Sequence, residues 1–158
     1  MLDYKLVSTY LRHEQGVLYW IKNKCTAKAG NVAGGFDRYG YLRVNIGGKS
    51  QRVHRVVWLL HTGTWPDKDI DHLDRDKSNN DPSNLRLCTD SQNQANTTSK
   101  RKGFKGVTLH KCGKYQAQHR RKYLGLFETE MLAAKAYDEA ARNTFGAFAR
   151  CNFQGEAA

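Results

Sequence analysis

Short runs of β-branched and aromatic residues, separated by glycines, occupy the first fifty positions of the chain. Two of these runs, 17–21 and 39–46, have the composition and the length of β-strands. Gly47 and Gly48 follow the second run directly, and a Gly-Gly pair is typical of a tight hairpin turn. We therefore expect the N-terminal fifty residues to form short strands.

The apolar pattern changes from strand-like to helix-like after residue 51. Apolar residues are spaced by three, one and three positions at Val53, Val56, Val57 and Leu60. This spacing places them on one side of a helix. A glycine and a proline shortly beyond residue 61 end the pattern. The segment 52–61 is therefore predicted to be a helix.

The stretch from 70 to 96 predicts a strand, a long loop, a second strand and a short helix. The loop contains the polar run DKSNNDPSN, residues 85–88 have strand character, and 90–96 predict a helix with Asp90 as its N-cap. The polar, basic run TTSKRK at 97–102 has no apolar period, which is typical of a linker. We place one domain at 1–97, a basic linker at 98–103 and a second domain at 104–153.

The last part of the chain predicts three strands followed by one helix. Residues 104–109, 115–119 and 122–127 have strand-like composition, with a turn at 112–114. Thr129 can cap a helix from Glu130 to about residue 143. The apolar face of that helix is predicted to comprise Leu132, Ala133, Ala136, Tyr137, Ala140 and Ala141. We therefore expect a small sheet packed on one helix.

The chain has 158 residues and a formal net charge of +11, which favours a polyanionic partner such as nucleic acid. Residues 1–50 carry a net charge of +5, residues 51–100 carry zero and residues 101–158 carry +6. Six aspartates crowd into positions 67–81. A divalent cation is the usual reason for acidic groups in a protein that binds a polyanion. The basic residues of the first fifty positions either contact phosphates or are ordinary solvated charge.

The cysteines lie far apart and form no CxxC pair, which argues against a zinc ribbon. We expect them to be buried free thiols of a reduced, cytoplasmic protein. The N-terminus lacks a signal-peptide pattern, and no apolar run approaches membrane-spanning length. No membrane association is expected.

Four polar residues between 70 and 96 have the chemistry needed for phosphodiester hydrolysis. Asp71 offers a carboxylate and Asn93 an amide oxygen, and such hard ligands suit Mg²⁺ or Mn²⁺. Imidazoles exchange protons near neutral pH, so His72 can take a proton from an attacking water. The amide of Asn84 has donor and acceptor atoms that can join parts of the long loop to one another and keep His72 in a fixed orientation. Turn geometry alone is the alternative explanation for any one of these residues.

The pair DH at 71–72, followed by Asn84 and Asn93, resembles the His-Asn-His (HNH) endonuclease motif of phage and intron-encoded homing endonucleases. GYLRVNI, RVHRVVWLLHTGTWP and NLRLCT extend the resemblance over roughly residues 15–97. It implies a ββα-metal nuclease fold with His72 as the general base, Asn84 as the loop-organising residue, and Asp71 and Asn93 as metal ligands. Many family members have histidine where this chain has Asn93. An asparagine at this position argues against zinc as the bound metal.

Two neighbouring side chains have roles that the sequence leaves open. His54 can approach the phosphate from the predicted helix, although a packed scaffold role is the more common one for such a histidine. Arg86 can face either a phosphate or Asp74. We therefore leave both out of the predicted catalytic set.

Residues 103–153 resemble the plant Apetala / ethylene-response-factor DNA-binding domain through LGxFxT, AAxAYDxAA and a terminal NF. The resemblance implies a three-stranded sheet that lies in the DNA major groove. Alternation along the middle strand places Gln116, Gln118 and Arg120 on one face, and we expect this polar, basic face, Gln116 included, to meet phosphates and base edges of DNA. The residues that the resemblance aligns with DNA contacts are Lys105, Thr108, His110, Lys114, Gln118, Arg120, Arg121 and Tyr123. Thr108 and Cys112 replace a usual arginine and tryptophan, so the target sequence is not transferable, and a solvated polar face is the alternative.

Together these patterns predict an α+β protein: a ββα-metal nuclease domain plus a small three-stranded antiparallel sheet packed on one helix. The predicted function is that of a site-specific, Mg²⁺- or Mn²⁺-dependent homing-type DNA endonuclease. We expect it to be phage-encoded or to act inside a host cell. It is expected to bind double-stranded DNA as a monomer and to nick it. A DNA-binding regulator with an inactive nuclease fold is the main alternative, and an RNA-binding module is the second.

Overall fold

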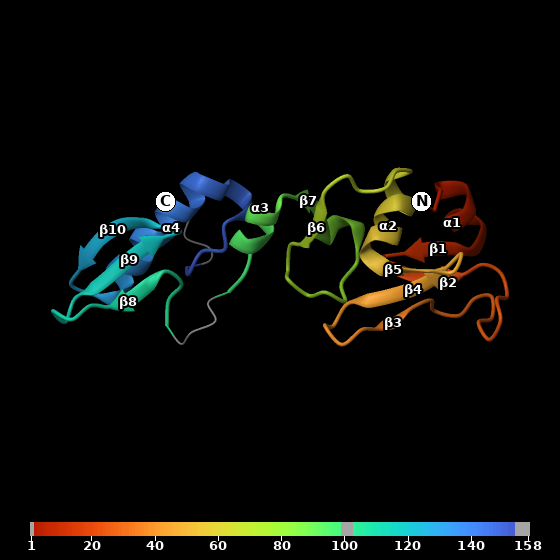
Figure 1. Cartoon of the computed structure of the whole chain (residues 1–158), viewed down its shortest axis with the longest axis horizontal. Coiled ribbons are helices and arrows are strands. Elements are labelled where there is room, and N and C mark those ends of the chain that lie inside the picture. The colour runs from red at the N-terminus through yellow and green to blue at the C-terminus, as the bar shows by residue number, and fades with distance from the viewer. Residues whose placement is uncertain (1, 99–102, 154–158) are drawn as a thin grey trace. The chain divides into compact units, whose positions relative to one another are not determined.

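The computed structural model describes residues 2–98 and 103–153, which belong to two compact units, Met1–Thr89 and Asp90–Ala158 (Figure 1). The predicted limit after residue 97 lies inside the second unit, because α3 (Asp90–Ala95) groups with that unit. Of the predicted basic linker 98–103, residues 99–102 lie outside the described residues. The domain assignment therefore stays a prediction, and each unit is considered by itself.

Short antiparallel strands surround one central helix in the first unit. Its elements, in order, are α1 (Tyr4–Tyr10), β1 (Leu11–Glu14), β2 (Val17–Trp20), β3 (Gly35–Phe36), β4 (Leu42–Ile46), β5 (Lys49–Arg52), α2 (Val53–Thr62), β6 (Asp69–His72), the 3-10 turn η1 (Pro82–Asn84) and β7 (Leu85–Cys88). The strands pair as β1-β2, as β3-β4-β5 and as β6-β7. The strand, loop and strand predicted around residues 70–88 are confirmed.

The hydrophobic core of the first unit gathers around α2. Val53, Val56, Val57 and Leu59 are buried on this helix and pack with apolar residues of α1, β1, β2 and β4. Leu59 is buried, whereas Leu60, which the spacing favoured, is only partly covered. Ile70 of β6 and Leu85 of β7 belong to the same core, and the β6–β7 hairpin is therefore anchored to the body of the unit.

Helix α1 corrects the prediction that the first fifty residues form strands throughout. The Asp3 side chain accepts a hydrogen bond from Leu6 N at 2.7 Å and caps the helix. Val7 is the buried residue of α1. One buried position in seven residues creates no apolar period, and the pattern could not reveal this helix.

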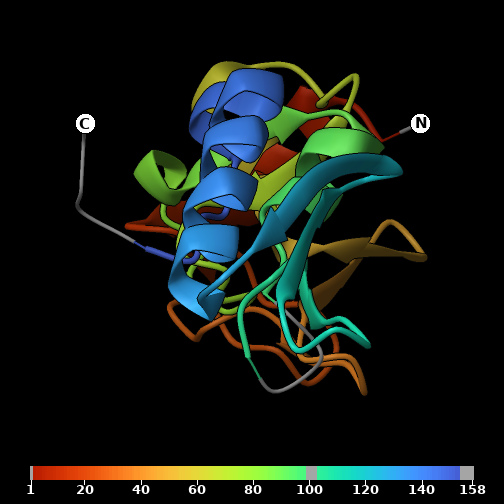
Figure 2. The same cartoon turned by 90° about the vertical axis from the view of Figure 1, so that its left-hand side faces the viewer.

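The second unit contains α3, a sheet in the order β10-β9-β8 and a long helix packed on one face of the sheet (Figure 2). The remaining elements are β8 (Val107–Leu109), β9 (Tyr115–His119), β10 (Lys122–Phe127), α4 (Glu130–Phe145) and the 3-10 turn η2 (Gly146–Phe148). The predicted three-stranded sheet and single helix are confirmed. Strand β8 begins later than predicted, because Gly106 turns at φ +78° where the Tyr137 ring leaves no room for a side chain.

The buried face of α4 differs in part from the predicted one. Leu132 is 51% exposed, while Ala134 and Asp138 are buried. The Asp138 carboxylate accepts hydrogen bonds from the backbone N–H groups of Asn152 at 2.7 Å and Phe153 at 2.9 Å. A buried carboxylate satisfied by backbone donors cannot be recognised from apolar spacing, and this explains the difference.

The cysteines are free, but not all are buried as predicted. Cys25 and Cys112 are exposed, Cys88 is buried and Cys151 is partly covered.

Within residues 2–98 and 103–153, no helix has both the length and the apolar character needed to cross a membrane.

Gly16, in the turn between β1 and β2, presses against the loop that precedes β7. It adopts φ +80°, and a Cβ at this position would lie 2.2 Å from the backbone carbon of Asn80 and the backbone nitrogen of Asp81. Gly40 has nearly the same φ, +81°, but nothing within 4 Å. The two glycines therefore separate the effect of backbone strain from the effect of close packing.

We expect Gly16→Ala to lower the free energy of unfolding of the first unit by about 2 kcal/mol more than Gly40→Ala does. Both substitutions strain a left-handed backbone, but only the first also drives a methyl group into backbone atoms. Denaturant unfolding followed by tryptophan fluorescence measures this, because all three tryptophans lie within residues 1–89. Equal losses in the two variants would show that the turn does not press on the loop.

Candidate functional site

The β6–β7 hairpin positions Asp71 and His72 at the end of its first strand. Asp71 pairs across the hairpin with Arg86, and His72 pairs with Leu85. Asp71 and His72 are each only 5% exposed. Two polar side chains buried at adjacent positions need partners, since unpaired buried polar groups are costly.

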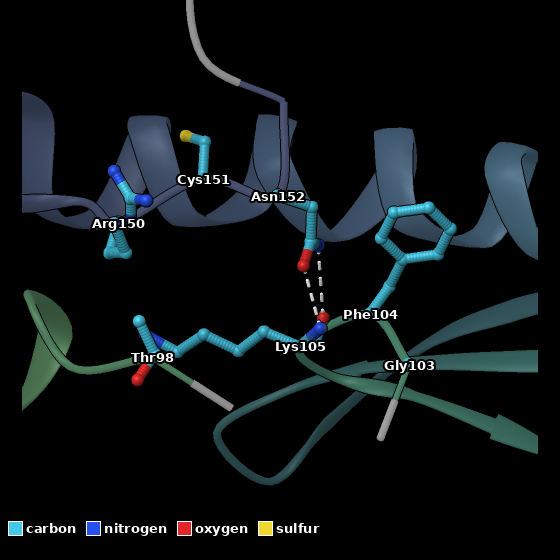
Figure 3. A pocket seen from close by; sticks show the side chains of 7 residues that line it. All are labelled: Thr98, Gly103, Phe104, Lys105, Arg150, Cys151 and Asn152. Atoms are coloured by element: carbon cyan, nitrogen blue, oxygen red, sulfur yellow. Dashed lines mark hydrogen bonds between the residues drawn. The ribbon is translucent and has the colours of Figure 1, made fainter. Parts of the chain in front are cut away.

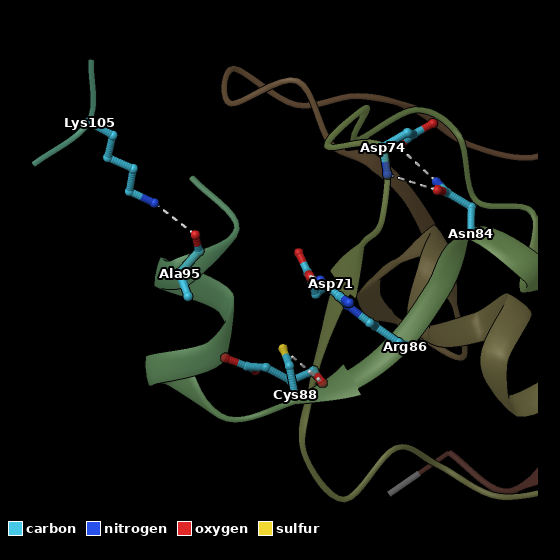
Figure 4. A network of polar contacts seen from close by, with 8 residues as sticks. Asp71, Asp74, Asn84, Arg86, Cys88, Ala95 and Lys105 are labelled. Carbon is cyan, nitrogen blue, oxygen red and sulfur yellow. Dashed lines mark hydrogen bonds and ion pairs between the residues drawn. The ribbon is translucent and has the colours of Figure 1, made fainter. Parts of the chain in front are cut away.

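Arg86 supplies the partner for Asp71 (Figure 4). Its Nε and one terminal nitrogen donate to Asp71 Oδ2 at 3.0 and 2.8 Å. This ion pair is largely shielded, with 17% of the arginine side chain and 6% of the aspartate side chain exposed. From the sequence, the partner of Arg86 could be either a phosphate or Asp74. In the structure, Arg86 forms its ion pair with Asp71.

Asn84 closes the loop between β6 and β7, in the organising position that the sequence predicted (Figure 4). Its Oδ1 accepts from Asp74 N at 3.0 Å, and its Nδ2 donates to Asp74 Oδ1 at 2.9 Å and to Asn79 O at 2.8 Å. Burial raises the pKa of Asp74, but the hydrogen bonds from Asn84 and Asn79 outweigh it and lower that pKa below its ordinary value. The loop is therefore held by a nearly buried amide and an ionised carboxylate.

Asn80, which the spacing of the polar run does not single out, lies within hydrogen-bonding distance of His72. The His72 Nε2 atom lies 3.1 Å from Asn80 Oδ1, and Asn80 Nδ2 donates to Ser78 O at 3.1 Å. Asn80 is 3% exposed. The sequence analysis gave Asn84 the task of orienting His72, but the contacts of Asn84 go to the loop backbone and to Asp74. The run DKSNNDPSN contains three asparagines, and nothing in its spacing distinguishes their roles.

Two further rings surround His72. The His54 ring centroid lies 5.1 Å from that of His72, at an interplanar angle of 85°, and the Tyr41 centroid lies 6.3 Å away. Burial lowers the pKa of His54 to about 3, and the nearby charges of His72 and Arg52 act in the same direction. His54 is therefore neutral and packed edge to face against His72, as expected of a scaffold residue.

The described residues contain no group of three or more His, Cys, Asp or Glu side chains placed to hold a metal ion. A soft or thiolate-based metal site is therefore unsupported in this part of the chain. One carboxylate, Asp71, with neutral oxygens, water and phosphate as further ligands, is a donor set that suits Mg²⁺. Asn93 lies on α3 in the second unit, and its role as a ligand stays a prediction.

In the second unit, four of the predicted DNA-contacting residues share one face of the sheet. Thr108 pairs directly with Gln116, and Gln118 pairs directly with Tyr123. Direct cross-strand partners project to the same side, as do residues two apart on β9. Tyr123 is 57% exposed, although it carries a large ring. The sheet therefore presents a largely polar face with one exposed aromatic ring, and Leu126, the direct partner of Gln116 on β10, lies on the same face.

The other predicted DNA-contacting residues lie in different surroundings. Lys114 forms an exposed ion pair with Glu128, at 2.6 Å, and His110 Nδ1 lies 3.0 Å from Cys112 Sγ. Arg120 and Arg121 occupy the turn between β9 and β10, where Arg120 adopts φ +58°. These side chains lie at the two turns that border the sheet.

Lys105 is the predicted contact with the most internal partners. Its Nζ donates to the carbonyl oxygens of Ala95 at 2.8 Å and Thr97 at 2.7 Å. Its backbone N–H donates to Asn152 Oδ1 at 2.6 Å (Figure 3). Burial lowers the pKa of Lys105. These contacts connect α3 with the start of β8 and with the C-terminal segment, and a DNA contact by this side chain stays a prediction.

Acid should destabilise the first unit through His54. The folded pKa of about 3 lies below the unfolded value of 6.5, and stability is therefore intact above pH 6.5 and is lost as the pH falls from there towards 3. At about pH 4.5 the loss is on the order of 2 to 3 kcal/mol. We expect His54→Phe, which keeps a packed ring, to flatten the pH dependence by about that amount. Denaturant unfolding at neutral and acidic pH, followed by tryptophan fluorescence, measures the difference, and an unchanged pH dependence in the variant would contradict it.

Comparisons with known proteins agree with the polar motif around β6 and β7. The family model of HNH endonuclease matches residues 51–95. This range includes α2, the β6–β7 hairpin and α3. It therefore contains Asp71, His72, Asn84 and Asn93.

Relatives resemble the chain over different extents. An uncharacterized HNH endonuclease (L560) of Acanthamoeba polyphaga mimivirus is 37% identical over 116 residues, which cover 66% of this chain and 58% of that protein. APETALA2-like protein 2 of Oryza sativa subsp. indica is 49% identical over 57 residues, which cover 32% of this chain and 13% of that protein. The solved structure titled "DNA binding and cleavage by the HNH homing endonuclease I-HmuI" is 30% identical with a TM-score of 0.43, over 60% of this chain and 55% of that chain.

The chain thus spans less than two thirds of each of these relatives. Residues 51–95 match the HNH endonuclease model, and a stretch of 57 residues matches APETALA2-like protein 2. Over part of its length the chain is thus similar to an HNH endonuclease and to Apetala2 and ethylene-response-factor proteins.

Proposed function

We propose that this protein is a metal-dependent endonuclease that cuts double-stranded DNA at specific sites by nicking one strand. The observation that carries the proposal is the buried His72, with Asn80 at its Nε2, next in sequence to the buried carboxylate of Asp71. The match of residues 51–95 to the HNH endonuclease model supports the same reaction.

His72 is proposed as the general base. Because an amide oxygen, Asn80 Oδ1, faces Nε2, we propose that Nε2 carries the proton and that Nδ1 is the basic atom. Nδ1 takes a proton from a water molecule whose oxygen forms a bond to phosphorus. The bond from phosphorus to the 3′ oxygen breaks, and the leaving oxygen acquires a proton from solvent. Asn84 acts indirectly, since it holds the loop that carries Asn80.

Asp71 is the proposed protein ligand for Mg²⁺ or Mn²⁺, and the amide oxygen of Asn93 is proposed as a second ligand, as the resemblance implies. When bound, the ion would stabilise the charge of the phosphate in the transition state and of the leaving oxygen. Arg86 keeps the buried Asp71 carboxylate charge-balanced and in place.

The polar sheet face of the second unit is proposed to bind duplex DNA. Gln116 and Gln118 have amide groups that can pair with base edges, and Tyr123 offers a ring and a hydroxyl group. Similarity to APETALA2-like protein 2 and to an ethylene-responsive transcription factor of Arabidopsis thaliana supports this assignment. We propose that the protein acts as a monomer, because one catalytic histidine per chain suffices for a nick.

A DNA-binding regulator without nuclease activity is the second candidate. Arg86 already neutralises Asp71, and the described residues contain no cluster of three metal-binding side chains. An inactive nuclease fold that kept its DNA contacts would share both features.

We expect the protein to nick supercoiled plasmid with Mg²⁺ and not with EDTA. We expect His72→Ala to lower the nicking rate at least about 100-fold, because it removes the general base. DNA binding in EDTA should be largely unchanged. His61→Ala, at an exposed position on α2, is the matched control and should nick like the unaltered protein.

Full activity in His72→Ala would reject His72 as the base. Absence of any metal-dependent nicking by the unaltered protein, with DNA binding retained, would instead favour the regulator.

The double substitution Gln118→Ala with Tyr123→Ala should weaken duplex binding about 10-fold or more, because contacts to bases are lost. The rate of nicking of DNA that is already bound should change little. Met131→Ala removes an exposed side chain from α4 and serves as the control. Fluorescence anisotropy with a labelled duplex in EDTA measures binding, and unchanged affinity in the double variant would leave the sheet face without a role in DNA binding.

A further inference from the structure

Tyr41 lies between the rings of the candidate active site and two exposed cations. Its ring centroid is 5.7 Å from that of His54 and 6.3 Å from that of His72. The Arg52 guanidinium carbon lies over the same ring at 4.5 Å, and the Lys77 ammonium lies over it at 4.6 Å. Two positive charges thus lie over the Tyr41 ring, which is itself a neighbour of the His72 ring.

The two cations come from separate elements and converge on Tyr41. Arg52 ends strand β5, directly before α2, whereas Lys77 belongs to the loop that Asn84 closes. Lys77 Nζ also donates to Tyr39 O at 2.9 Å, which attaches that loop to the segment leading into β4. Both cations are exposed to solvent. Their positions are set by the fold, and their charged groups still face water.

No salt bridge neutralises these two cations within the described part of the chain. Neither Arg52 nor Lys77 forms an ion pair there, since the ion pairs join other residues. The exposed Asp37 carboxylate lies near enough for the charge of Arg52 to help lower its pKa, but its hydrogen bonds come from the backbone N–H groups of Tyr39 and Tyr41, at 2.8 and 3.0 Å. An ammonium has three donors and Lys77 uses one, while the side chain of Arg52 makes no hydrogen bond to another described residue.

We propose that Arg52 and Lys77, oriented by Tyr41, form a clamp for the DNA backbone phosphates beside the bond that is cut. Preorganised cations on an aromatic ring lose little freedom when they bind an anion. A purely structural role for Lys77 would explain its bond to Tyr39, but it would not explain why Arg52 approaches the same ring with its donors open. The inference rests on the proposed function, and it adds the group that holds the substrate phosphate near His72.

Salt dependence tests the clamp. Binding of a mixed-sequence DNA duplex is measured in EDTA, between about 50 and 200 mM salt, for Arg52→Gln, Lys77→Gln and Lys5→Gln. Each clamp variant should reduce the slope of log K against log salt by about 0.9, because one phosphate contact is lost. Lys5 is an exposed lysine on α1, and its substitution removes the same charge at a remote position. An equal slope change in all three variants, or no change in Arg52→Gln, overturns the proposal.

Tyr41 gives a second, independent comparison. Tyr41→Phe keeps the ring and should bind and nick like the unaltered protein, whereas Tyr41→Leu should show the weaker binding and smaller salt slope of the clamp variants. Thermal unfolding followed by tryptophan fluorescence identifies any variant that fails to fold. If Tyr41→Leu folds and keeps the full salt slope, the ring does not orient the cations and the clamp is rejected.

Nicking separates this inference from the proposed function. With saturating plasmid and Mg²⁺, Arg52→Gln should nick about 10-fold more slowly, because the phosphate is misplaced relative to His72. Lys5→Gln should not change that rate. Nicking with unaltered salt slopes in the clamp variants would reject the clamp and keep the nuclease. Reduced slopes without any nicking would keep the phosphate contacts and reject the nuclease.

Discussion

The side chain of Asn84 makes three hydrogen bonds across the loop between β6 and β7, two to Asp74 and one to Asn79. The loop carries no regular hydrogen-bonded ladder of its own, so an amide with both donor and acceptor atoms replaces one. Asn84 is 9% exposed, and its hydrogen bonds therefore lie largely out of competition with water. The position of Asn80 at His72, and of Lys77 at Tyr41, depends on this closed loop.

The surrounding scaffold limits how the loop and the hairpin can move. Ile70 and Leu85 place the hairpin in the core, and His54 of the central helix packs against the His72 ring. On another side, Gly16 brings the β1–β2 turn against the backbone of Asn80 and Asp81. The hairpin and its loop are thus supported by the core and by two elements that lie far from them in sequence, α2 and the β1–β2 turn. A general base supported in this way has a single orientation, as proton transfer to a positioned group requires.

The predictions from sequence succeeded where one physical signal dominates. The apolar period identified α2 and α4, and strand composition identified β7, β9 and β10. The roles that the chemistry of the polar run suggests for Asp71, His72 and Asn84 stay predictions. Helix α1 was not predicted, because it is stabilised by a side-chain cap and one buried valine, and these produce no apolar period. A different reason explains why Asn80, and the partners of Arg86 and Lys105, were not predicted. Their partners are set by three-dimensional contacts, which a linear spacing of asparagines or basic residues does not encode.

The central claim is that Asn80 holds His72 as a base with its proton on Nε2. Long-range ¹H–¹⁵N correlation spectra of the labelled protein at mildly alkaline pH report directly which ring nitrogen of a neutral histidine carries the proton. We expect the Nε2–H form for His72, and a mixture of both forms in Asn80→Ala. A proton on Nδ1 in the unaltered protein would contradict the account, because Nε2 would then be the basic nitrogen and Asn80 could not accept its proton.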